Sequence, residues 1–327
     1  MVEGGWSRRG LIAGVAALWG GPAFAEAVQP QPLAAPETLK GILDQTHRLT
    51  TEVYINGQGP FLFLVDTGAD HSVITQELAA GLGLPTGATV RVHGVAGDVT
   101  SPSAFVSEFR VGSRGLHDVA LPLLLQDNVG AVGVLGIDVL QGQRVVFDFR
   151  GDRILISDSR PQRAAADEVV IKAHSRFGQL VLVDSSLDDW AIPVVIDTGA
   201  ESSIANSAFE RRTRLELVGR ANELTAIYSV TGQSTTGRWG VVPALRVGGF
   251  LIKHVPVVFS DLRTFDRWRL QNQPALLLGM DVLRMFDKVE IDFARREVRF
   301  AGLHAEQDLL DPHLLRMARG HAYPPHA

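Results

Sequence analysis

The sequence predicts an all-β protein made of two similar lobes, and two observations lead to that prediction. Four short motifs occur twice, in the same order, at offsets of 131, 136, 143 and 144 residues. An ordered repeat at a nearly constant offset indicates a duplicated structural unit. Both copies contain apolar runs of strand length separated by turn residues, whereas helical patches are few and short. A chain of 327 residues is long enough for two such domains.

The repeated motifs delimit the lobes. The run at 65–69, Val-Asp-Thr-Gly-Ala, recurs at 196–200 as Ile-Asp-Thr-Gly-Ala. The other repeats pair residues 110–112 with 246–248, 135–140 with 278–283, and 148–149 with 292–293. We therefore place an N-terminal lobe at residues 48–158 and a C-terminal lobe at residues 167–303, joined by a short linker.

Each lobe is predicted to consist of strands in the same order. Alternation or continuous apolar character predicts strands at residues 49–55, 61–65, 104–111 and 145–156, the last with a turn at Gly151. The second lobe repeats this at residues 180–183, 192–196, 240–247 and 289–300. Short helices are expected at residues 76–82, after each Gly-x-Asp-Val-Leu motif, and in the tail at 304–327, where Leu and Met follow helical spacing.

The first 25 residues resemble a signal peptide. Arg8 and Arg9 precede a mild apolar run at 11–19, which is followed by a small-x-small cleavage motif that ends at Ala25. Twin arginines before a weak apolar segment are typical of twin-arginine (Tat) export, and an ordinary Sec signal is the alternative. An uncleaved anchor is disfavoured, because about 15 apolar or small residues are fewer than the roughly 20 that span a membrane.

We therefore expect an exported protein, periplasmic or secreted, that is cleaved after Ala25 and has no membrane span in the mature chain. Residues 26–47 are rich in Pro, Ala and Gln and are interpreted as a linker. The chain has no cysteine, which excludes disulfides, thiolate metal sites and a cysteine nucleophile. Folding in the reducing cytosol before Tat export would account for that absence.

Composition and motifs argue against several other classes of function. A net charge of −5 gives no overall attraction to nucleic acid. The sequence contains no phosphate-binding loop, no His-Glu-x-x-His zinc motif and no Gly-x-Ser-x-Gly nucleophile motif. We therefore expect no cofactor, no metal site and no nucleic-acid partner.

The repeated aspartates are the strongest candidates for chemistry. Asp66 follows a buried apolar strand and precedes a Thr-Gly turn, where a carboxylate is costly unless it has partners. A single such residue could simply cap a turn. Asp197 stands at the equivalent position, and duplicated halves tend to pack about a pseudo-two-fold axis, so the two carboxyls could meet. Such a pair shares a proton, and one member then acts as base and the other as acid.

These motifs resemble those of the aspartic proteases. The pattern of two apolar residues before Asp-Thr-Gly-Ala, with a later pair of apolar residues before Gly in each half, is similar to that family. Asp70 after the first copy resembles the retropepsin-like branch. The whole chain resembles a bacterial retropepsin-like aspartic protease with two fused lobes, arranged as in pepsin. The resemblance implies two pseudo-symmetric, barrel-like lobes and an aspartic endopeptidase with a polypeptide substrate, for which dimerisation is not required.

The resemblance also assigns roles to individual residues. Asp66 and Asp197 match the catalytic aspartates that activate a water. In that family, the threonines of the two Asp-Thr-Gly motifs bind each other's backbone, and the glycines of these motifs keep the carboxyls coplanar. The glycine that follows the later apolar pair in each half packs under the active-site loop. The matching supporting residues are Thr67, Gly68, Ala69, Thr198, Gly199, Ala200, Gly136 and Gly279.

Two departures from the family pattern carry expectations. Pepsins usually have Ser or Thr where this chain has Ala69 and Ala200. That hydroxyl favours the charged form of a catalytic carboxyl, so its absence predicts a pair that titrates higher and a weakly acidic to near-neutral optimum. Asp70 is matched by Glu201, so we expect an asymmetric cleft.

Two glycine-tipped segments are candidates for flaps that cover the substrate. They lie at residues 92–97 and 227–232, at similar places in the two halves. Ordinary surface hairpins are the alternative for both segments, and Tyr228 could instead be a core aromatic. The candidate substrate-binding residues are His93, Gly94, Val95, Tyr228, Ser229 and Val230. A catalytically silent peptide-binding protein or a cell-envelope assembly protein on the same fold is the alternative function.

Overall fold

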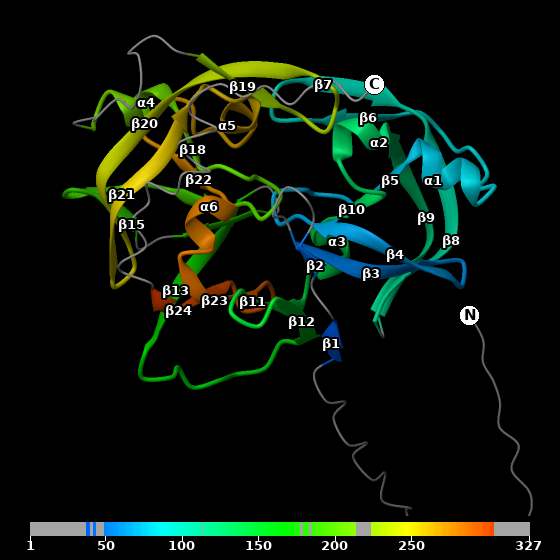
Figure 1. The fold of residues 1–327 in the computed structure, drawn as a ribbon, viewed down its shortest axis with the longest axis horizontal. Coiled ribbons are helices and arrows are strands. Elements are labelled where there is room, and N and C mark those ends of the chain that lie inside the picture. The colour runs from blue at the N-terminus through cyan, green and yellow to red at the C-terminus, as the bar shows by residue number, and fades with distance from the viewer. Residues whose placement is uncertain are drawn as a thin grey trace, which may run out of the picture. The chain divides into compact units, whose positions relative to one another are not determined.

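The structure is a computed structural model that describes residues 37–39, 42–43, 49–112, 114–176, 179–182, 185–213 and 224–303. The predicted signal peptide at 1–25 and the predicted C-terminal helix at 304–327 lie outside these residues. Within the described ranges, no helix is both long enough and apolar enough to cross a membrane. The described chain consists mainly of strands and forms two barrel-like lobes, as the sequence predicts (Figure 1).

The N-terminal lobe is a closed barrel of six strands. Its strands pair in the order β3-β4-β10-β5-β9-β8, and β8 returns to pair with β3. Phe63 and Phe109 fill the interior at a ring separation of 5.4 Å, and both are fully buried. The strands are β3 (Leu49–Ile55), β4 (Gln58–Val65), β5 (Val73–Thr75), β8 (Ser103–Val111), β9 (Arg114–Leu124) and β10 (Gly133–Leu135).

The C-terminal lobe repeats the parallel and antiparallel pairings of this barrel without closing. The chain runs β13-β14-β17-β22-β18-β21-β20-β15-β16, and β19 (Leu224–Tyr228) pairs with β20 alone. The strands are β13 (Glu168–Arg176), β14 (Gln179–Leu182), β15 (Ser185–Leu187), β16 (Trp190–Ala191), β17 (Val194–Ile196), β18 (Ile204–Ala205), β20 (Ser234–Val247), β21 (Phe250–Phe259) and β22 (Leu276–Leu278).

A sheet of strands from both halves joins the lobes. Its order is β1-β12-β11-β23-β24-β13, and the seam is the antiparallel pair of β11 (Gln143–Asp148) and β23 (Phe286–Asp292). The remaining strands are β1 (Glu37–Leu39), β12 (Arg153–Asp158) and β24 (Glu297–Leu303). In Figure 1 this sheet lies along the lower side of the described chain. β1 pairs with β12, and β2 (Ile42–Leu43) pairs with β3, so two strands fall within residues 26–47, which the sequence analysis interprets as a linker.

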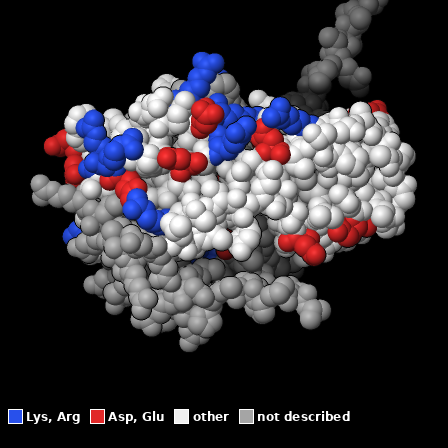
Figure 2. Space-filling view, turned by 90° about the horizontal axis from the view of Figure 1, so that it is seen from above, with Lys and Arg blue, Asp and Glu red and all other residues white. Residues whose placement is uncertain are grey.

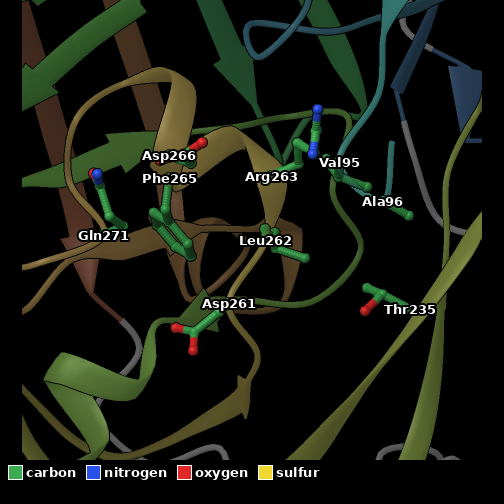
Figure 3. Close-up of a pocket in the computed structure, with 9 residues that line it drawn as sticks. All are labelled: Val95, Ala96, Thr235, Asp261, Leu262, Arg263, Phe265, Asp266 and Gln271. Atoms are coloured by element: carbon green, nitrogen blue, oxygen red, sulfur yellow. The ribbon is translucent and has the colours of Figure 1, made fainter. Parts of the chain in front are cut away.

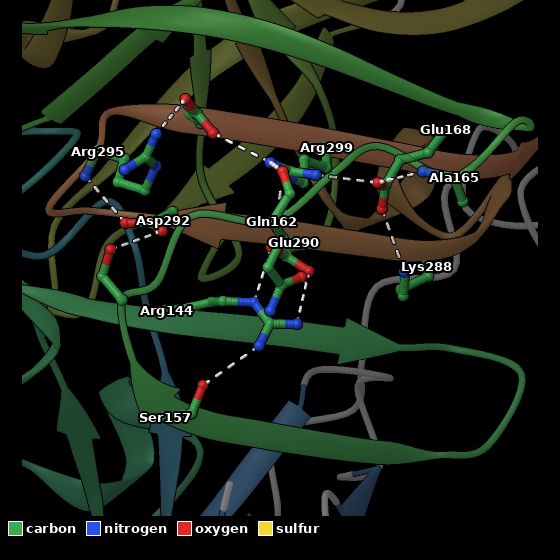
Figure 4. A network of polar contacts seen from close by, with 12 residues as sticks. Arg144, Ser157, Gln162, Ala165, Glu168, Lys288, Glu290, Asp292, Arg295 and Arg299 are labelled. Atoms are coloured by element: carbon green, nitrogen blue, oxygen red, sulfur yellow. Dashed lines mark hydrogen bonds and ion pairs between the residues drawn. The ribbon is translucent and has the colours of Figure 1, made fainter. Parts of the chain in front are cut away.

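Buried charges cross the seam between the halves (Figure 4). Arg144 of β11 makes a two-pronged contact with Glu290 of β23, at 2.7 Å and 2.9 Å. Arg299, on β24, contacts Glu168 at 3.1 Å and Glu297 at 3.2 Å. The contacts of Arg299 lie within the C-terminal half, whereas Arg144–Glu290 joins the two halves. A buried ion is tolerated only when paired, so the pairing of Glu290 with Arg144 favours a single register between the halves.

The helices are short and lie between consecutive strands. α1 (Gln76–Gly81) lies at the predicted position, with Thr75 as its N-cap. α3 (Ile137–Leu140) and α6 (Met280–Leu283) form within the Gly-x-Asp-Val-Leu motifs rather than after them, because the chain goes directly from each motif into β11 or β23. The others are α2 (Gln126–Val129), α4 (Ser207–Glu210) and α5 (Arg263–Arg267).

Candidate active site

The two Asp-Thr-Gly-Ala segments occupy equivalent places in the lobes. Each follows a central strand, β4 or β17, that pairs in parallel with the strand before the second repeated glycine, β10 or β22. Asp66 N–H donates to the Leu135 carbonyl at 3.0 Å, and Asp197 N–H donates to the Leu278 carbonyl at 3.1 Å. The backbone of each aspartate is therefore anchored to the end of a buried strand.

The carboxyl group of each aspartate is oriented by its own turn. Asp66 Oδ1 accepts hydrogen bonds from the N–H groups of Gly68 at 2.7 Å and Ala69 at 3.1 Å. Asp197 Oδ1 accepts from Gly199 at 2.9 Å and Ala200 at 3.2 Å. Both turns thus hold their carboxyls in the same way.

The two carboxyl groups also lie against each other's loops. A methyl group at Gly68 would stand 2.6 Å from Asp197 Cγ, and one at Gly199 would overlap the Asp66 carboxyl. Only glycine permits this approach from either side. The structure therefore brings Asp66 and Asp197 together across the interface between the lobes.

The threonines of the two segments form a reciprocal clasp. Thr67 Oγ1 donates to the Ile196 carbonyl at 3.0 Å and accepts from Thr198 N–H at 3.1 Å. Thr198 Oγ1 donates to the Val65 carbonyl at 2.8 Å and accepts from Thr67 N–H at 3.1 Å. Both side chains are buried, so these four hydrogen bonds hold the loops together in a water-poor environment.

The environments of the two aspartates differ. Asp197 is 7% exposed, whereas Asp66 is half-buried. Burial, and then the negative charge of Asp66 and a hydrogen bond with its carboxyl, raise the pKa of Asp197 well above its usual range, against the opposing N–H groups of its turn. Asp197 therefore retains a proton at a pH where an ordinary aspartate is ionised.

The remaining predicted supporting residues lie at the base of the two loops. The Ala69 carbonyl accepts from Ile137 N–H at 2.9 Å, and the Ala200 carbonyl accepts from Met280 N–H at 2.9 Å. A methyl group at Gly136 would stand 2.6 Å from the His71 carbonyl carbon, and one at Gly279 would stand 2.6 Å from that of Ser202. Each glycine thus lets a supporting strand touch the loop.

Sequence reasoning missed two Ser–Asp pairs that lie beside the supporting glycines. The Asp138 carboxylate accepts from Ser72, and the Asp281 carboxylate accepts from Ser203. A signal was present, because Ser72 and Ser203 each follow their catalytic-motif aspartate by six residues, and both partner aspartates lie in the repeated Gly-x-Asp-Val-Leu motif.

The first candidate flap is the hairpin of β6 (Val90–His93) and β7 (Asp98–Ser101). His93 Nδ1 lies 2.9 Å from Asp98 Oδ1 across its strands. Gly94 lies at the tip, against the side chains of Ser229 and Thr231. The Val95 carbonyl accepts from Arg263 N–H at 3.0 Å, which links the tip to the C-terminal lobe.

The second candidate flap is the hairpin of β19 and β20. Ser229 and Val230 form its turn, in which Ser229 N–H donates to the Gln233 carbonyl at 2.8 Å. The Gln233 side chain donates to the Asp98 carbonyl at 3.2 Å, so the two hairpins contact each other. Tyr228 is 80% exposed, which excludes a role as a core aromatic.

The flap tips reach the lobes opposite their own. Val95 packs on an apolar cluster of the C-terminal lobe that also contacts Ala200, and Val230 packs on a cluster of the N-terminal lobe that also contacts Ala69. Each tip therefore shares an apolar cluster with one of the aspartate loops. On the side of the molecule where β7 and β19 lie, acidic and basic side chains are intermixed (Figure 2).

A pocket of about 270 Å³ adjoins the first flap tip. Figure 3 shows Leu262 and Phe265 within it, with Val95, Ala96 and Thr235 at one side. Asp261, Arg263, Asp266 and Gln271 complete the lining.

Asp70 and its counterpart Glu201 make different contacts. The Asp70 carboxylate contacts Arg267 of α5 at 2.6 Å, and the Glu201 backbone carbonyl accepts from Asp281 N–H. Among the described residues, no three metal-ligating side chains gather into a metal site.

Comparison with known proteins identifies the family. A family model described as aspartyl protease matches residues 51–139 and 183–282, more than half of the chain and one segment in each lobe. A search of curated proteins finds no match. The chain is also similar to a solved structure described as "Crystal structure of edgp", with 9% sequence identity and a TM-score of 0.45, covering 83% of this chain and 96% of that one. Because the family model matches in both halves, the chain belongs to the aspartyl protease family.

Proposed function

We propose that this protein is an aspartic endopeptidase in which Asp66 and Asp197 activate a water molecule for attack on a peptide bond. The observation that supports this most is the approach of the two carboxyls, each lying against the glycine of the opposite loop. Two carboxyls in contact share a proton, which provides a base and an acid at one pH. One chain supplies both groups, so the reaction does not require a second subunit.

The difference in burial suggests which carboxyl takes which role. Asp66 is the more exposed member and acts as the base. Asp197, whose pKa is raised by burial and by Asp66, carries the shared proton. The pair titrates as one system, so these roles describe the prevailing protonation state.

The reaction then proceeds without a covalent enzyme intermediate. Asp66 removes a proton from the bound water, and the water oxygen bonds to the peptide carbonyl carbon. Asp197 transfers its proton to the carbonyl oxygen, which gives a neutral diol. The proton now on Asp66 moves to the peptide nitrogen, the carbon–nitrogen bond breaks, and a hydroxyl proton of the diol returns to Asp197.

The flap hairpins are proposed to cover an extended polypeptide substrate. His93, Gly94 and Val95 of the first hairpin and Tyr228, Ser229 and Val230 of the second would contact it. Closing such hairpins over a substrate excludes water and strengthens the electrostatic interactions of the site.

A cleavage assay tests this function. The chain from residue 26 onward is incubated with a denatured protein, with and without pepstatin. We expect cleavage that pepstatin blocks and that Asp66→Asn or Asp197→Asn abolishes. Peptide binding without cleavage by the wild-type chain would instead indicate a silent binding protein, and residual cleavage in either variant would contradict the two-carboxyl mechanism.

Export is proposed as part of the same function. The twin arginines and the small-x-small motif before Ala25 support passage through the Tat system and a periplasmic or secreted mature protein. Sequencing the N-terminus of the protein recovered outside the cytoplasm should find residue 26. Replacing Arg8 and Arg9 with Lys should retain the chain in the cytoplasm, whereas unchanged export would point to the Sec route.

A further inference from the structure

The two Ser–Asp pairs below the catalytic loops have nearly identical geometry. In the N-terminal lobe, Asp138 accepts from Ser72 N–H at 2.9 Å and from Ser72 Oγ at 2.7 Å. In the C-terminal lobe, Asp281 accepts from Ser203 N–H at 2.9 Å and from Ser203 Oγ at 2.6 Å. Both serines are fully buried. Two independent copies of the same double contact indicate a shared requirement rather than an accident of one lobe.

Each pair extends by one further bond to the strand that anchors a catalytic aspartate. Ser72 Oγ accepts from Gly136 N–H at 3.0 Å, and Ser203 Oγ accepts from Gly279 N–H at 3.0 Å. The residues before these glycines are Leu135 and Leu278, whose carbonyls hold the N–H groups of Asp66 and Asp197. The serine hydroxyl is therefore separated from the anchored aspartate by one peptide unit.

A second backbone hydrogen bond in each lobe also joins the supporting strand to the aspartate loop. The residue after each glycine donates its N–H to the alanine carbonyl of the Asp-Thr-Gly-Ala segment. The loop between the catalytic aspartate and the serine is thus tied to the supporting strand at both ends. Removing the serine hydroxyl would leave the glycine N–H without its partner. Removing the aspartate carboxyl would leave the serine N–H and hydroxyl without theirs. In either case the loop would shift to recover hydrogen bonds for these buried groups.

We propose that Asp138 with Ser72, and Asp281 with Ser203, are positioning residues that hold the carboxyls of Asp66 and Asp197 in register for the reaction. The proposal rests on the proposed endopeptidase function. The hydrogen bonds of these four residues go to one another and to the backbone of the loops and supporting strands, so they act through the loops. Because small misplacement of a catalytic group slows chemistry strongly, their loss should lower kcat and leave substrate binding nearly intact.

Steady-state kinetics of matched variants test the proposal. We expect Ser203→Ala and Asp281→Ala to lower kcat by about 10- to 100-fold, with KM changed less than about twofold. Asp281→Asn keeps an acceptor for the serine and should retain most of the activity. Ser72→Ala, Asp138→Ala and Asp138→Asn should show the same pattern in the other lobe.

A control pair is available at the seam between the lobes. Asp292 is also buried, and it accepts from Ser159 Oγ at 2.8 Å and from Arg295 N–H at 2.9 Å, remote in sequence from both catalytic loops. Asp292→Ala should therefore lower stability while leaving kcat per folded molecule unchanged. The proposal is overturned if the variants of the two pairs match this control, or if they raise KM alone.

A measurement that needs no activity separates this proposal from the proposed function. With aspartate labelled at the carboxyl carbon, the NMR signal of Asp197, identified by its loss in Asp197→Asn, reports the pH midpoint of that group. We expect Ser203→Ala to shift the midpoint, and Asp281→Asn and Asp292→Ala to leave it nearly unchanged. If the wild-type protein cleaves no peptide but Ser203→Ala still shifts the pH midpoint of Asp197, the endopeptidase function is refuted and positioning is supported. An unchanged midpoint in Ser203→Ala would refute positioning.

Discussion

The two lobes agree at their centre and differ at their periphery. Near the interface, the main contacts of one aspartate loop have counterparts in the other, from the threonine clasp to the serine–aspartate pairs. Further out, the N-terminal barrel closes through β3 and β8, whereas the C-terminal sheet stays open. The hairpin of β19 and β20 is part of that open sheet, whereas the hairpin of β6 and β7 forms a separate two-stranded sheet. The comparison indicates that the paired chemistry constrains only the centre of the duplicated fold.

Even the centre is not fully symmetric. Asp197 is more deeply buried than Asp66, and on the C-terminal side burial also raises the pKa of Asp281 to about 6. A symmetric pair of carboxyls would share its proton equally. Unequal burial instead favours one protonated partner, which in the proposed mechanism gives the acid and the base separate locations.

The largest expected effect comes from substituting the glycines that lie against the two carboxyls. Gly68→Ala and Gly199→Ala each place a methyl group against the opposite carboxyl, so each should reduce kcat/KM by about 100-fold or more. The comparison predicts effects of similar size for both variants. Gly81→Ala, at a position of the N-terminal lobe where a methyl group meets no other atom, is a control for expression and folding and should retain activity. A tolerated alanine at either central glycine would contradict the close approach.

The threonine clasp should have the next largest effect, and on stability. Thr67→Val and Thr198→Val preserve shape but leave two backbone groups without their hydrogen-bond partners. We expect a loss of about 2–4 kcal/mol in the free energy of unfolding for each, measured by urea denaturation. The double variant should cost less than the sum of the two, because the hydroxyls serve one clasp. Strict additivity would show that the two threonines act separately.

The smallest effect sharpens the difference between the lobes. The raised pKa of Asp281 means that the folded protein binds more protons than the unfolded chain between about pH 4 and pH 6. Stability contributed by this group is therefore present at lower pH and is lost as the pH rises through this window. Asp281→Asn should flatten that part of the stability curve, whereas Asp138→Asn keeps Asp281 and should retain the wild-type slope.

Sequence patterns predicted the strands and the aspartate loops because both are local signals. Continuous apolar runs such as residues 61–65 and 192–196 became the central strands, and the duplicated Asp-Thr-Gly-Ala pointed to the pair of carboxyls. An element that depends on a distant partner was not predicted. β1 has little strand character of its own and forms by pairing with the edge strand β12.

The serine–aspartate pairs were missed for a related physical reason. Ser72 and Asp138 are 66 residues apart, and each is an unremarkable polar residue when considered alone. Their contact exists only once β4 and β10 lie in parallel and bring the two loops together. Likewise, barrel closure depends on whether the two edge strands of a sheet pair with each other. The alternation of apolar residues within one strand carries no information on that pairing.

The pH dependence of kcat/KM tests the central claim most directly, because a proton shared between Asp66 and Asp197 must produce two limbs. We predict a bell-shaped profile with a weakly acidic to near-neutral optimum, since Ala69 and Ala200 supply no hydroxyl to favour the charged carboxyls and burial raises the pKa of Asp197. A profile that peaks below about pH 3, or one without a falling limb on the alkaline side, would contradict the account.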